Sequence, residues 1–279
     1  GVHDEVRGAT GLGRGGAGFP AGVKWGLMPA GKYPRYLVVN GDESEPGTYK
    51  DRLLMERDPH QLVEGCLIAA YAAGLSQVFL YIRGEMPLAH ERVAVALNDA
   101  YAAGYVGKNI LGTNFSVDIV LHWGAGAYVV GEETALIESL EGKRGEPRLK
   151  PPFFPAAIGL YGQPTIVNNV ETLSNLPWLL VNGAQAFTAI GTATSPGTRM
   201  VAVSGHVVRP GVYEIVNGTT TFRDLLYGDE FCQGIRDGNE LKAFVPGGGS
   251  APWFTPEQLD LPFEGKLLGA AGSMLGSGA

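Results

Sequence analysis

The sequence has too little cysteine for a disulfide-stabilised or cysteine-ligated metal protein, because only two of its 279 residues are cysteines. Cys66 and Cys232 lie far apart and outside any CxxC spacing, so neither framework is indicated and a reducing compartment fits best. Basic residues are also in deficit, since 21 Lys and Arg face 28 Asp and Glu. The net charge of −7 would not attract a polyanion, and we expect no nucleic-acid partner.

A long apolar run is missing as well. The stretch from Cys66 to Ile82 carries no formal charge, but Gly74, Ser76 and Gln77 interrupt it, and a helix followed by a strand explains it better than a membrane span. We therefore expect no direct membrane insertion. The first residues, GVHDE, lack an initiator Met and the apolar core of a signal peptide, so we expect the chain to begin inside a longer protein.

Glycine, by contrast, is abundant: its 42 residues are about twice the average usage. They form local clusters without the three-residue period of collagen, which indicates tight turns or backbone lying against a ligand. The length suits two cores. We expect a larger domain at residues 1–190 and a smaller one at 191–279.

Apolar residues recur with two different periods through the larger part of the chain. Short strand-like runs alternate with segments of helical spacing, which is typical of a parallel α/β sheet. The expected strands are 36–39, 77–82 and 115–121, and the expected helices are 60–73, 88–103, 132–140 and 170–181. Little regular structure is expected at 11–31, in the polar loop after residue 41 and at 147–164, and a β-rich unit with one helix and strands at 200–205 and 242–245 is expected beyond 197.

The first glycine cluster, GLGRGGAGFP at residues 11–20, places five glycines in eight positions, and Lys24 follows it. A phosphate needs backbone N–H groups that no Cβ obstructs and a cation that balances its charge, and this segment offers both. The cluster matches neither GxxxxGK[ST] nor a GxGxxG between strand and helix, which disfavours nucleotide hydrolysis and an ordinary Rossmann site. A flexible tether is the alternative interpretation.

Two acidic segments stand where a ligand could bind, one after an expected strand and one after a glycine-bearing loop. NGDESEPG at residues 40–47 sets three carboxylates in four positions at the C-terminal end of a strand, where open α/β sheets bind ligands, and GEET at 131–134 repeats the arrangement. Carboxylates at such places suit hydroxyl-rich ligands. Solvated acidic turns, or a helix start favoured by the helix dipole, are the alternatives. Lys24 and the glycine cluster disfavour a divalent metal, and we expect no metal site in this chain.

Amides and aromatics complete the candidate residues. VNNVET at residues 167–172 supplies two amides and a hydroxyl, which both donate and accept hydrogen bonds, although a helix cap is equally open. Aromatic side chains stand in loops beside the motifs, where stacking on a flat ring and ordinary loop packing are both open: Phe19, Tyr128, Phe153 and Phe154. The histidines show no ligand spacing, and His3 is expected in a terminal tail.

Taken together, GLGRGGAGFP with Lys24, NGDESEPGTYKDR, GAGAYVVGEETALIESLEGKRGEPRLKPPF and GQPTIVNNVET resemble the NADH-binding flavoprotein subunit of respiratory complex I over nearly the whole chain. The resemblance implies a Rossmann-like α/β domain with a mainly parallel sheet that holds FMN. It also implies a small β-grasp domain of the soluble-ligand-binding type, which residues 198–264 with SGHVVRPGVYEI and VPGGGS resemble.

The resemblance also implies a role for each motif residue. The FMN and nucleotide pocket would be lined by Gly13, Arg14, Gly15, Lys24, Asn40, Asp42, Glu43, Ser44, Gly131, Glu132, Asn168, Asn169 and Thr172. NADH would meet Phe19 and Phe153 at the adenine, with Lys150 nearby, Glu133 at the adenosine ribose, and Tyr128 and Glu45 at the nicotinamide, with Tyr128 also at the flavin. A carboxylate at the ribose accepts a 2′-OH hydrogen bond and repels a 2′-phosphate, which favours NADH over NADPH.

The implied reaction is hydride transfer from NADH to FMN without a side-chain acid, followed by single-electron transfer to iron–sulfur clusters of partner subunits and finally to quinone. The implied location is the cytoplasmic side of a bacterial inner membrane or the mitochondrial matrix side. The sequence departs from the family pattern in four places: a glycine cluster one residue short, Val130 in place of cysteine, an extra Phe at 153–154, and no C-terminal domain with the motif of a [4Fe–4S] cluster. Because of the extra residue, the ring that stacks on the adenine could be either Phe153 or Phe154.

Two other functions stay open. One is the NADH-oxidising diaphorase module of a soluble hydrogenase or formate dehydrogenase, which has the same cofactors and another electron acceptor. The DESEPGTYKDR wording favours complex I. The other is a non-catalytic ligand-binding scaffold that kept the fold, which would bind no flavin.

Overall fold

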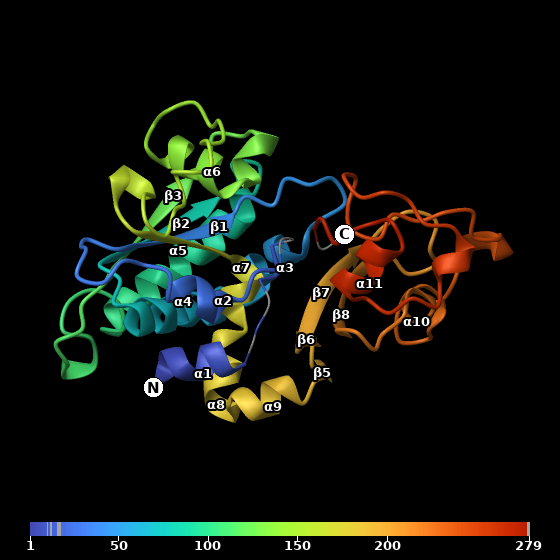
Figure 1. Ribbon diagram of the computed structural model, residues 1–279, viewed down its shortest axis with the longest axis horizontal. Helices are drawn as coiled ribbons and strands as arrows, with labels where there is room; N and C mark the ends of the chain where they lie inside the picture. Colours follow the sequence, from blue (N-terminus) through green and yellow to red (C-terminus); the bar gives the residue numbers. More distant parts are fainter. Residues whose placement is uncertain (10, 12, 16–17, 278–279) are drawn as a thin grey trace.

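The computed structural model describes residues 1–9, 11, 13–15 and 18–277, and its N-terminal lobe is built on a four-stranded parallel sheet (Figure 1). The strand order is β3 (Asp118–Trp123), β2 (Gln77–Ile82), β1 (Tyr36–Gly41) and β4 (Thr165–Asn169). In the register of β1, Val39 lies between Leu80 and Asn168. Because the strands are parallel, their carboxyl ends share one edge of the sheet, and the loops that follow them meet there.

Helices cover both faces of this sheet. On one face, α4 (Pro59–Ala73) and α5 (Pro87–Ala102) bury Leu37 and Val39, whereas on the other face α6 (Glu133–Leu140) buries Val38. The split follows from the two-residue period of a strand, which sends neighbouring side chains to opposite faces. Gly65 of α4 packs against α7 (Val170–Ser174) so closely that a Cβ there would lie 2.2 Å from the backbone oxygen of Leu173.

The predicted strands and helices of this lobe are confirmed within a few residues at 36–39, 60–73, 77–82, 88–103 and 132–140. The strand expected at 115–121 is found at Asp118–Trp123. The helix expected at 170–181 is interrupted at Asn175 and forms α7 and α8 (Leu176–Asn182). The loop expected at 147–164 contains one 3₁₀ turn, η3 (Leu160–Gly162).

Four elements were not expected from the sequence. The segment expected to lack regular structure contains α2 (Ala21–Trp25), the expected tail is α1 (Val2–Gly8), the polar loop after β1 contains α3 (Lys50–Arg57), and β4 precedes α7. The three helices have eight residues or fewer, too short to show a period or to be stable alone, so tertiary contacts hold them. One such contact joins His3 Nε2 to the backbone oxygen of Gly22 at 3.0 Å.

The C-terminal lobe has a separate apolar core. Here β7 (Thr198–Val203) and β8 (Gly211–Val216) form an antiparallel hairpin, and α10 (Phe222–Tyr227) contributes Phe222, whose ring centroid lies 4.5 Å from that of Phe263. The segment expected as a strand at 242–245 makes one bridge, between Phe244 and Phe254. The predicted fold class, a parallel α/β sheet with a smaller β-containing unit, is confirmed.

The two lobes lie side by side, and the C-terminal end of the described chain lies between them (Figure 1). No described helix has the length and apolar character needed to cross a membrane. The remaining elements are α9 (Ala184–Thr188), α11 (Gly265–Ala270), β5 (Gly191–Thr192), β6 (Ser195–Pro196), η1 (Ile110–Gly112), η2 (Tyr128–Gly131), η4 (Arg236–Gly238) and η5 (Pro256–Gln258).

Candidate functional site

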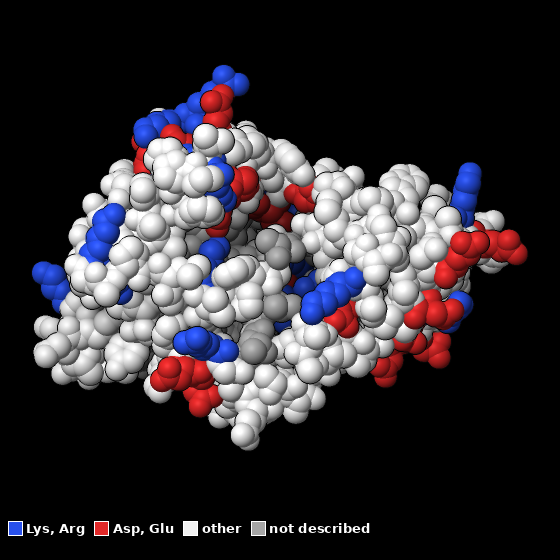
Figure 2. Space-filling view, viewed as in Figure 1, with Lys and Arg blue, Asp and Glu red and all other residues white. Residues whose placement is uncertain are grey.

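Two adjoining cavities open at the carboxyl edge of the sheet, and the C-terminal segment at 276–277 also lines the first of them. Cavity A, of about 360 Å³, is lined by residues that include Asp42, Glu45 and Tyr128, and cavity B, of about 600 Å³, by residues that include Phe19 and Glu133. Both cavities are lined by Gly15, Asn40, Gly131, Glu132 and Asn169, so they form one continuous depression. Figure 2 shows the hollow between the lobes, with acidic side chains gathered in it.

The topology explains this convergence. Asn40 and Asn169 are paired across β1 and β4 at the carboxyl edge, and the loop that precedes α6 crosses the same edge. Asn40 Nδ2 donates to the backbone oxygen of Gly131 (3.0 Å), and Ser44 Oγ donates to the backbone oxygen of Tyr128 (3.1 Å). The two acidic segments, distant in sequence, are thereby fastened to each other.

Every site residue named from the sequence lines one of the two cavities, with the exception of Phe153. Phe154 lines cavity B instead, while Phe153 lines a separate cavity with Arg148 and Tyr161. Of the two phenylalanines, Phe154 is the one that lines cavity B, so the placement of Phe153 at the adenine stays a prediction that this geometry does not favour. The physical reason is that neighbouring side chains in an irregular loop point in different directions, which no period in the sequence encodes. Leu12, Gly16 and Ala17 of the glycine cluster lie outside the described residues.

Asp42 is the most unusual carboxylate of the site. Only 6% of the residue is exposed, and neither carboxylate oxygen has a hydrogen-bond partner within the described residues. Burial raises the pKa of Asp42 to about 6, and the nearby Ser44 hydroxyl and the positive charge of Arg83 offset this only in part. A buried carboxylate without donors is costly, which suggests that a polar ligand supplies them.

Two other carboxylates of the site are already engaged by backbone. Glu43 accepts the N–H groups of Asp51 (3.0 Å) and Arg52 (2.9 Å) at the start of α3, whose N-cap provides no side-chain hydrogen bond. Glu132 caps α6 by accepting the N–H groups of residues 134 and 135 at 2.8 and 2.9 Å. The helix-cap alternative thus holds for both side chains, although both line the cavities.

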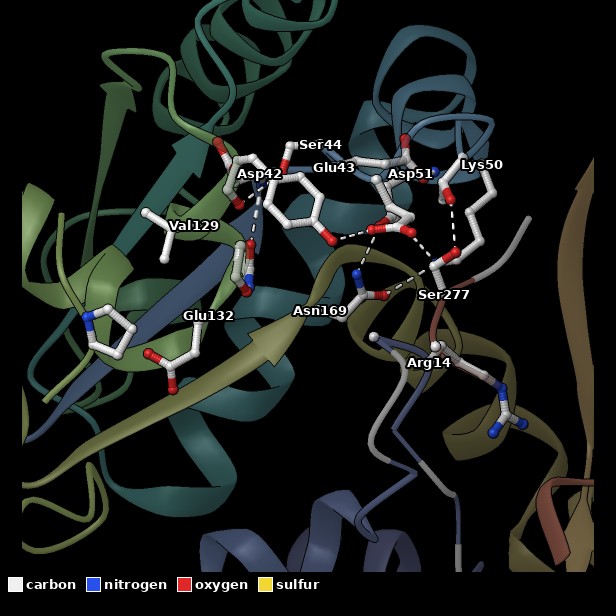
Figure 3. A pocket seen from close by; sticks show the side chains of 18 residues that line it. Arg14, Asp42, Glu43, Ser44, Lys50, Asp51, Val129, Glu132, Asn169 and Ser277 are labelled. Atoms are coloured by element: carbon white, nitrogen blue, oxygen red, sulfur yellow. Dashed lines mark hydrogen bonds and ion pairs between the residues drawn. The ribbon is translucent and has the colours of Figure 1, made fainter. Parts of the chain in front are cut away.

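Arg14 lines cavity A, but its guanidinium points away from it (Figure 3). Its Nε donates to the backbone oxygen of Thr198 (3.0 Å) and its Nη2 to that of Pro196 (3.1 Å), so the side chain ties the glycine cluster to the C-terminal lobe. The backbone N–H of Arg14 donates to Thr172 Oγ1 (2.9 Å). The side chain of Arg14 thus connects the two lobes. A buried guanidinium needs several acceptors, and the backbone oxygens of the C-terminal lobe provide them.

Cavity B contains a chain of alternating charges. Glu133 lies between Lys24 Nζ (2.9 Å) and Lys150 Nζ (2.8 Å), and Lys150 also pairs with Glu132 (3.0 Å). Burial would raise the pKa of Glu133, but Lys24 and Lys150 outweigh it and lower that pKa. The carboxylate is therefore ionised at neutral pH and presents a negative charge to the cavity.

Glu45 joins the two lobes at cavity A. One of its oxygens accepts the backbone N–H of Ser250 in the VPGGGS segment (2.8 Å), and the other accepts a short hydrogen bond from the hydroxyl of Tyr128. The hydrogen bond to Glu45 is the main reason that the pKa of Tyr128 is raised. Both residues named for the nicotinamide therefore contact each other, and a loop of the C-terminal lobe fixes one of them.

Sequence reasoning did not single out Lys50, Asp51, Glu171 and the C-terminal segment at 276–277. Gly276, Ser277, Lys50 and Asp51 line cavity A, and Glu171 forms buried ion pairs beneath it. Lys50 and Asp51 stand next to the acidic motif, in GTYKDR, and this position could have marked them as site residues. They were passed over because charged side chains in an expected polar loop are normally exposed to solvent. Within the described residues, no group of three or more His, Cys, Asp or Glu side chains could hold a metal ion.

The fold and the cavities define the chain as an α/β protein whose nucleotide-type site lies at the carboxyl edge of its parallel sheet. The model of the Nuo51 FMN-binding domain matches residues 6–178, which is more than half of the chain, and the chain belongs to that family. This confirms the family that the sequence motifs indicated.

Curated relatives agree. An NADH-quinone oxidoreductase subunit of Mycobacterium tuberculosis is 51% identical over 272 residues, which are 96% of this chain and 60% of the relative. A relative of the same name in Escherichia coli is 49% identical over 278 residues, 99% of this chain and 62% of the relative. The chain thus spans about 60% of the length of these relatives. A crystal structure of an NAD⁺-reducing [NiFe]-hydrogenase has a TM-score of 0.82 and 40% identity, and the match covers 94% of this chain and 43% of that chain.

The residues present fit an FMN. A Cβ at Gly15 would approach Asn169 Cβ to 3.2 Å, and one at Gly13 would approach the backbone oxygen of Phe19 to 3.1 Å, so glycine keeps these walls open. The amides of Asn40, Asn168 and Asn169 surround the same space, and Trp25 Nε1 fixes Asn168 by donating to its Oδ1 (2.9 Å). Asp42 offers a buried acceptor in need of donors, as the ribityl hydroxyls of FMN would provide.

Proposed function

We propose that this chain is the FMN- and NADH-binding part of an NADH:quinone oxidoreductase. The observation that carries the proposal is the convergence of the glycine cluster, both acidic segments and the paired asparagines on one continuous depression that contains the unsatisfied Asp42. Membership of the Nuo51 FMN-binding domain family supports it, as do relatives named for NADH-quinone oxidoreductase.

In this proposal the two cavities bind different parts of FMN and NADH. The residues shared by the two cavities would hold FMN, with Asp42 accepting from its hydroxyls and Tyr128 contacting its ring. Glu45 would contact the nicotinamide end of NADH, and Phe19 and Phe154 of cavity B would contact the adenosine end. When bound, FMN would accept two electrons as a hydride from NADH and release them one at a time.

The work of the protein is then to bind, to orient and to exclude water. Asn40, Asn168 and Asn169 are held by hydrogen bonds to their surroundings, so that their remaining donors and acceptors are fixed before the ligand arrives. Glu45 and Tyr128 brace each other at the mouth of cavity A. No titratable side chain needs to deliver a proton in the hydride step.

Glu133 is proposed to select NADH. A ribose 2′-OH can donate to its carboxylate, whereas a 2′-phosphate would meet a negative charge that Lys24 and Lys150 keep ionised. The ammonium groups of Lys24 and Lys150, which also line cavity B, would donate hydrogen bonds to the pyrophosphate of either dinucleotide.

The acceptor and partners are proposed from the relatives. Electrons would pass to iron–sulfur subunits and then to quinone. The assembly would lie at the cytoplasmic side of a bacterial inner membrane or the mitochondrial matrix side. We also propose the division into domains at 1–190 and 191–279.

A second candidate is the diaphorase module of a soluble hydrogenase, which the structural match to the NAD⁺-reducing [NiFe]-hydrogenase favours. Both functions predict the same first half-reaction. Identity near 50% to NADH-quinone oxidoreductase subunits, against 40% to the hydrogenase chain, favours the first.

The test is direct. The purified chain is mixed with FMN, freed of excess by gel filtration, and titrated with NADH without oxygen while the flavin absorbance is recorded. The proposal expects near-stoichiometric FMN and bleaching by NADH. A folded chain that retains no FMN would refute it, as the scaffold alternative predicts.

A further inference from the structure

Beneath cavity A lies a buried cation that no part of the proposed reaction uses. Lys50 belongs to the first turn of α3, its residue is 2% exposed, and it lines the cavity. Its Nζ lies 2.7 Å from Asp51 Oδ1 and 3.5 Å from Asn169 Oδ1 (Figure 3), and it lies 2.8 Å from Glu171 Oε2 of α7. The ammonium thus donates hydrogen bonds to Asp51 and Asn169 and forms an ion pair with Glu171.

The charge of Lys50 is permanent. Burial by itself would lower the pKa of the ammonium, but Asp51, Glu171 and Glu43 outweigh burial, and the pKa is raised. The side chain of Lys50 is therefore protonated at neutral pH. A positive charge in a place of low dielectric acts over a longer distance than one in water.

Lys50 also governs the orientation of an amide in the site. Asn169 Nδ2 donates to Asp51 Oδ2 (2.6 Å), while Asn169 Oδ1 accepts the backbone N–H of Glu171 (2.9 Å) and faces Lys50. The ammonium holds Asp51 by its other oxygen, so cation, carboxylate and amide form one connected network. With this orientation, a second N–H of Asn169 Nδ2 is left to donate to a ligand in the cavities, which Asn169 lines on both sides.

We propose that Lys50 is a positioning residue for the flavin: through Asp51 it fixes the Asn169 amide toward the cavity, and its charge stabilises added negative charge on the bound cofactor. The inference rests on the proposed FMN site. It predicts two separable effects, one on the affinity for FMN and one on the reduction potential of the bound flavin.

The variant Lys50→Met removes the charge and keeps most of the side-chain length. It leaves the buried Asp51 without its cation and Glu171 with only its longer ion pair to Arg14 (4.0 Å), and the Asn169 amide loses the partner that holds Asp51. We expect the Kd for FMN, measured by flavin fluorescence with the apo chain, to rise about tenfold or more. The midpoint potential of the flavin that does bind should move to a more negative value, because reduction adds negative charge near the removed cation.

The matched control is Arg52→Met, two residues along the same helix. Its side chain is 53% exposed and pairs with Glu56 of α3 (2.7 Å), so it loses a cation of α3 without touching the cavity. The Kd for FMN should stay within about twofold of the parent value, and the midpoint potential of the flavin should not shift, because an exposed ion pair contributes little.

Asp51→Asn provides a second route, in case Lys50→Met does not fold. The asparagine keeps the size of the side chain, but it presents either an NH2 group or an uncharged oxygen to Asn169 Nδ2 in place of a carboxylate oxygen. The Asn169 amide is then held less firmly, and FMN binding should weaken as it does in Lys50→Met. Asn169→Ala then tests the connection: in that background, Lys50→Met should weaken FMN binding by a much smaller factor than alone.

The outcomes distinguish a failure of the proposed FMN site from a failure of the role proposed for Lys50. A parent chain that binds no FMN refutes the proposed function itself. A parent that binds FMN, with a folded Lys50→Met or Asp51→Asn variant of unchanged Kd and potential, refutes only the role of Lys50. Fully additive effects of Lys50→Met and Asn169→Ala would also overturn it, because the lysine would then act independently of the amide.

Discussion

Replacement of Glu133 by glutamine offers the sharpest test of how the site would choose its dinucleotide. The four charged side chains of cavity B, Lys24, Glu132, Glu133 and Lys150, sum to zero, with Glu133 between the two lysines at 2.9 and 2.8 Å. Glu133→Gln gives this cluster a charge of +1 and keeps the length and hydrogen-bonding capacity of the side chain. The adenosine ribose would meet the changed charge directly.

The magnitude follows from Coulomb's law. A 2′-phosphate at roughly 5 Å from the carboxylate, with an effective dielectric constant of about 40 for a partly exposed site, is repelled by on the order of 1–2 kcal/mol. The side chain is 26% exposed, so the lower half of that range is appropriate. Loss of the charge-assisted hydrogen bond to the 2′-OH acts in the same direction on the ratio. We expect the ratio of kcat/KM for NADPH to that for NADH to rise about tenfold.

The assay is the rate of flavin bleaching by each dinucleotide at limiting concentration, with FMN-loaded protein and no oxygen. Glu146→Gln is the matched control, because it makes the same charge change at an exposed residue of the loop after α6, where the carboxylate pairs with Arg144 (3.1 Å). A Glu133→Gln variant whose ratio equals that of the parent would show that Glu133 does not meet the ribose.

Asp42→Asn should abolish most FMN binding and yet stabilise the apo chain. The pKa of Asp42 is raised from 3.8 to about 6 in the folded state, so the folded state binds the proton more tightly than the unfolded state does. The stability of the parent therefore falls as pH rises between those values. Urea unfolding should show a gain of about 2 kcal/mol at pH 7 and little at pH 4, and an equal effect at both pH values would contradict the reasoning. Glu132→Gln should cost about 1 kcal/mol at pH 7 through a weaker cap of α6, and less at low pH, since the folded pKa of Glu132 is lowered and its contribution disappears as the carboxylate is protonated; a loss independent of pH would argue against capping by the charged form. Gly65→Ala should destabilise by about 3 kcal/mol or more in thermal unfolding, because its Cβ would meet the Leu173 backbone, whereas Gly269→Ala, which meets nothing within 4 Å, should not; similar melting temperatures would refute the close packing of α4 on α7.

Much of the sheet could be predicted because its signals are local. The apolar runs at 36–39 and 77–82 and the helical spacing at 60–73 each fix an element within their own residues. β4 was missed because Asn168 and Asn169 end a five-residue strand with polar side chains, which alone indicate a helix cap. Parallel pairing with β1 makes this segment a strand, and that pairing joins residues more than a hundred positions apart.

The site divides in the same way. The acidic segments and the asparagine pair could be placed together because each follows a strand or precedes a helix, and parallel strands bring such points to one edge. This reason did not extend to the glycine cluster, because the helix α2 that follows it was not expected. The direction of each side chain could not be predicted. Arg14 turns to the C-terminal lobe, Glu43 turns to the start of α3, and Phe154 rather than Phe153 faces cavity B.

The sequence by itself determined the alternation of strands and helices, the family, and the set of loops that meet at the cavities, because periodicity and motif spacing are properties of neighbouring residues. The tertiary structure alone decided which charges are buried, which of them are paired, and which stay available to a ligand. Lys50 illustrates the reason: its three partners come from α3, α7 and the end of β4. The free energy of a buried polar group depends on atoms that only the folded chain brings within hydrogen-bond distance.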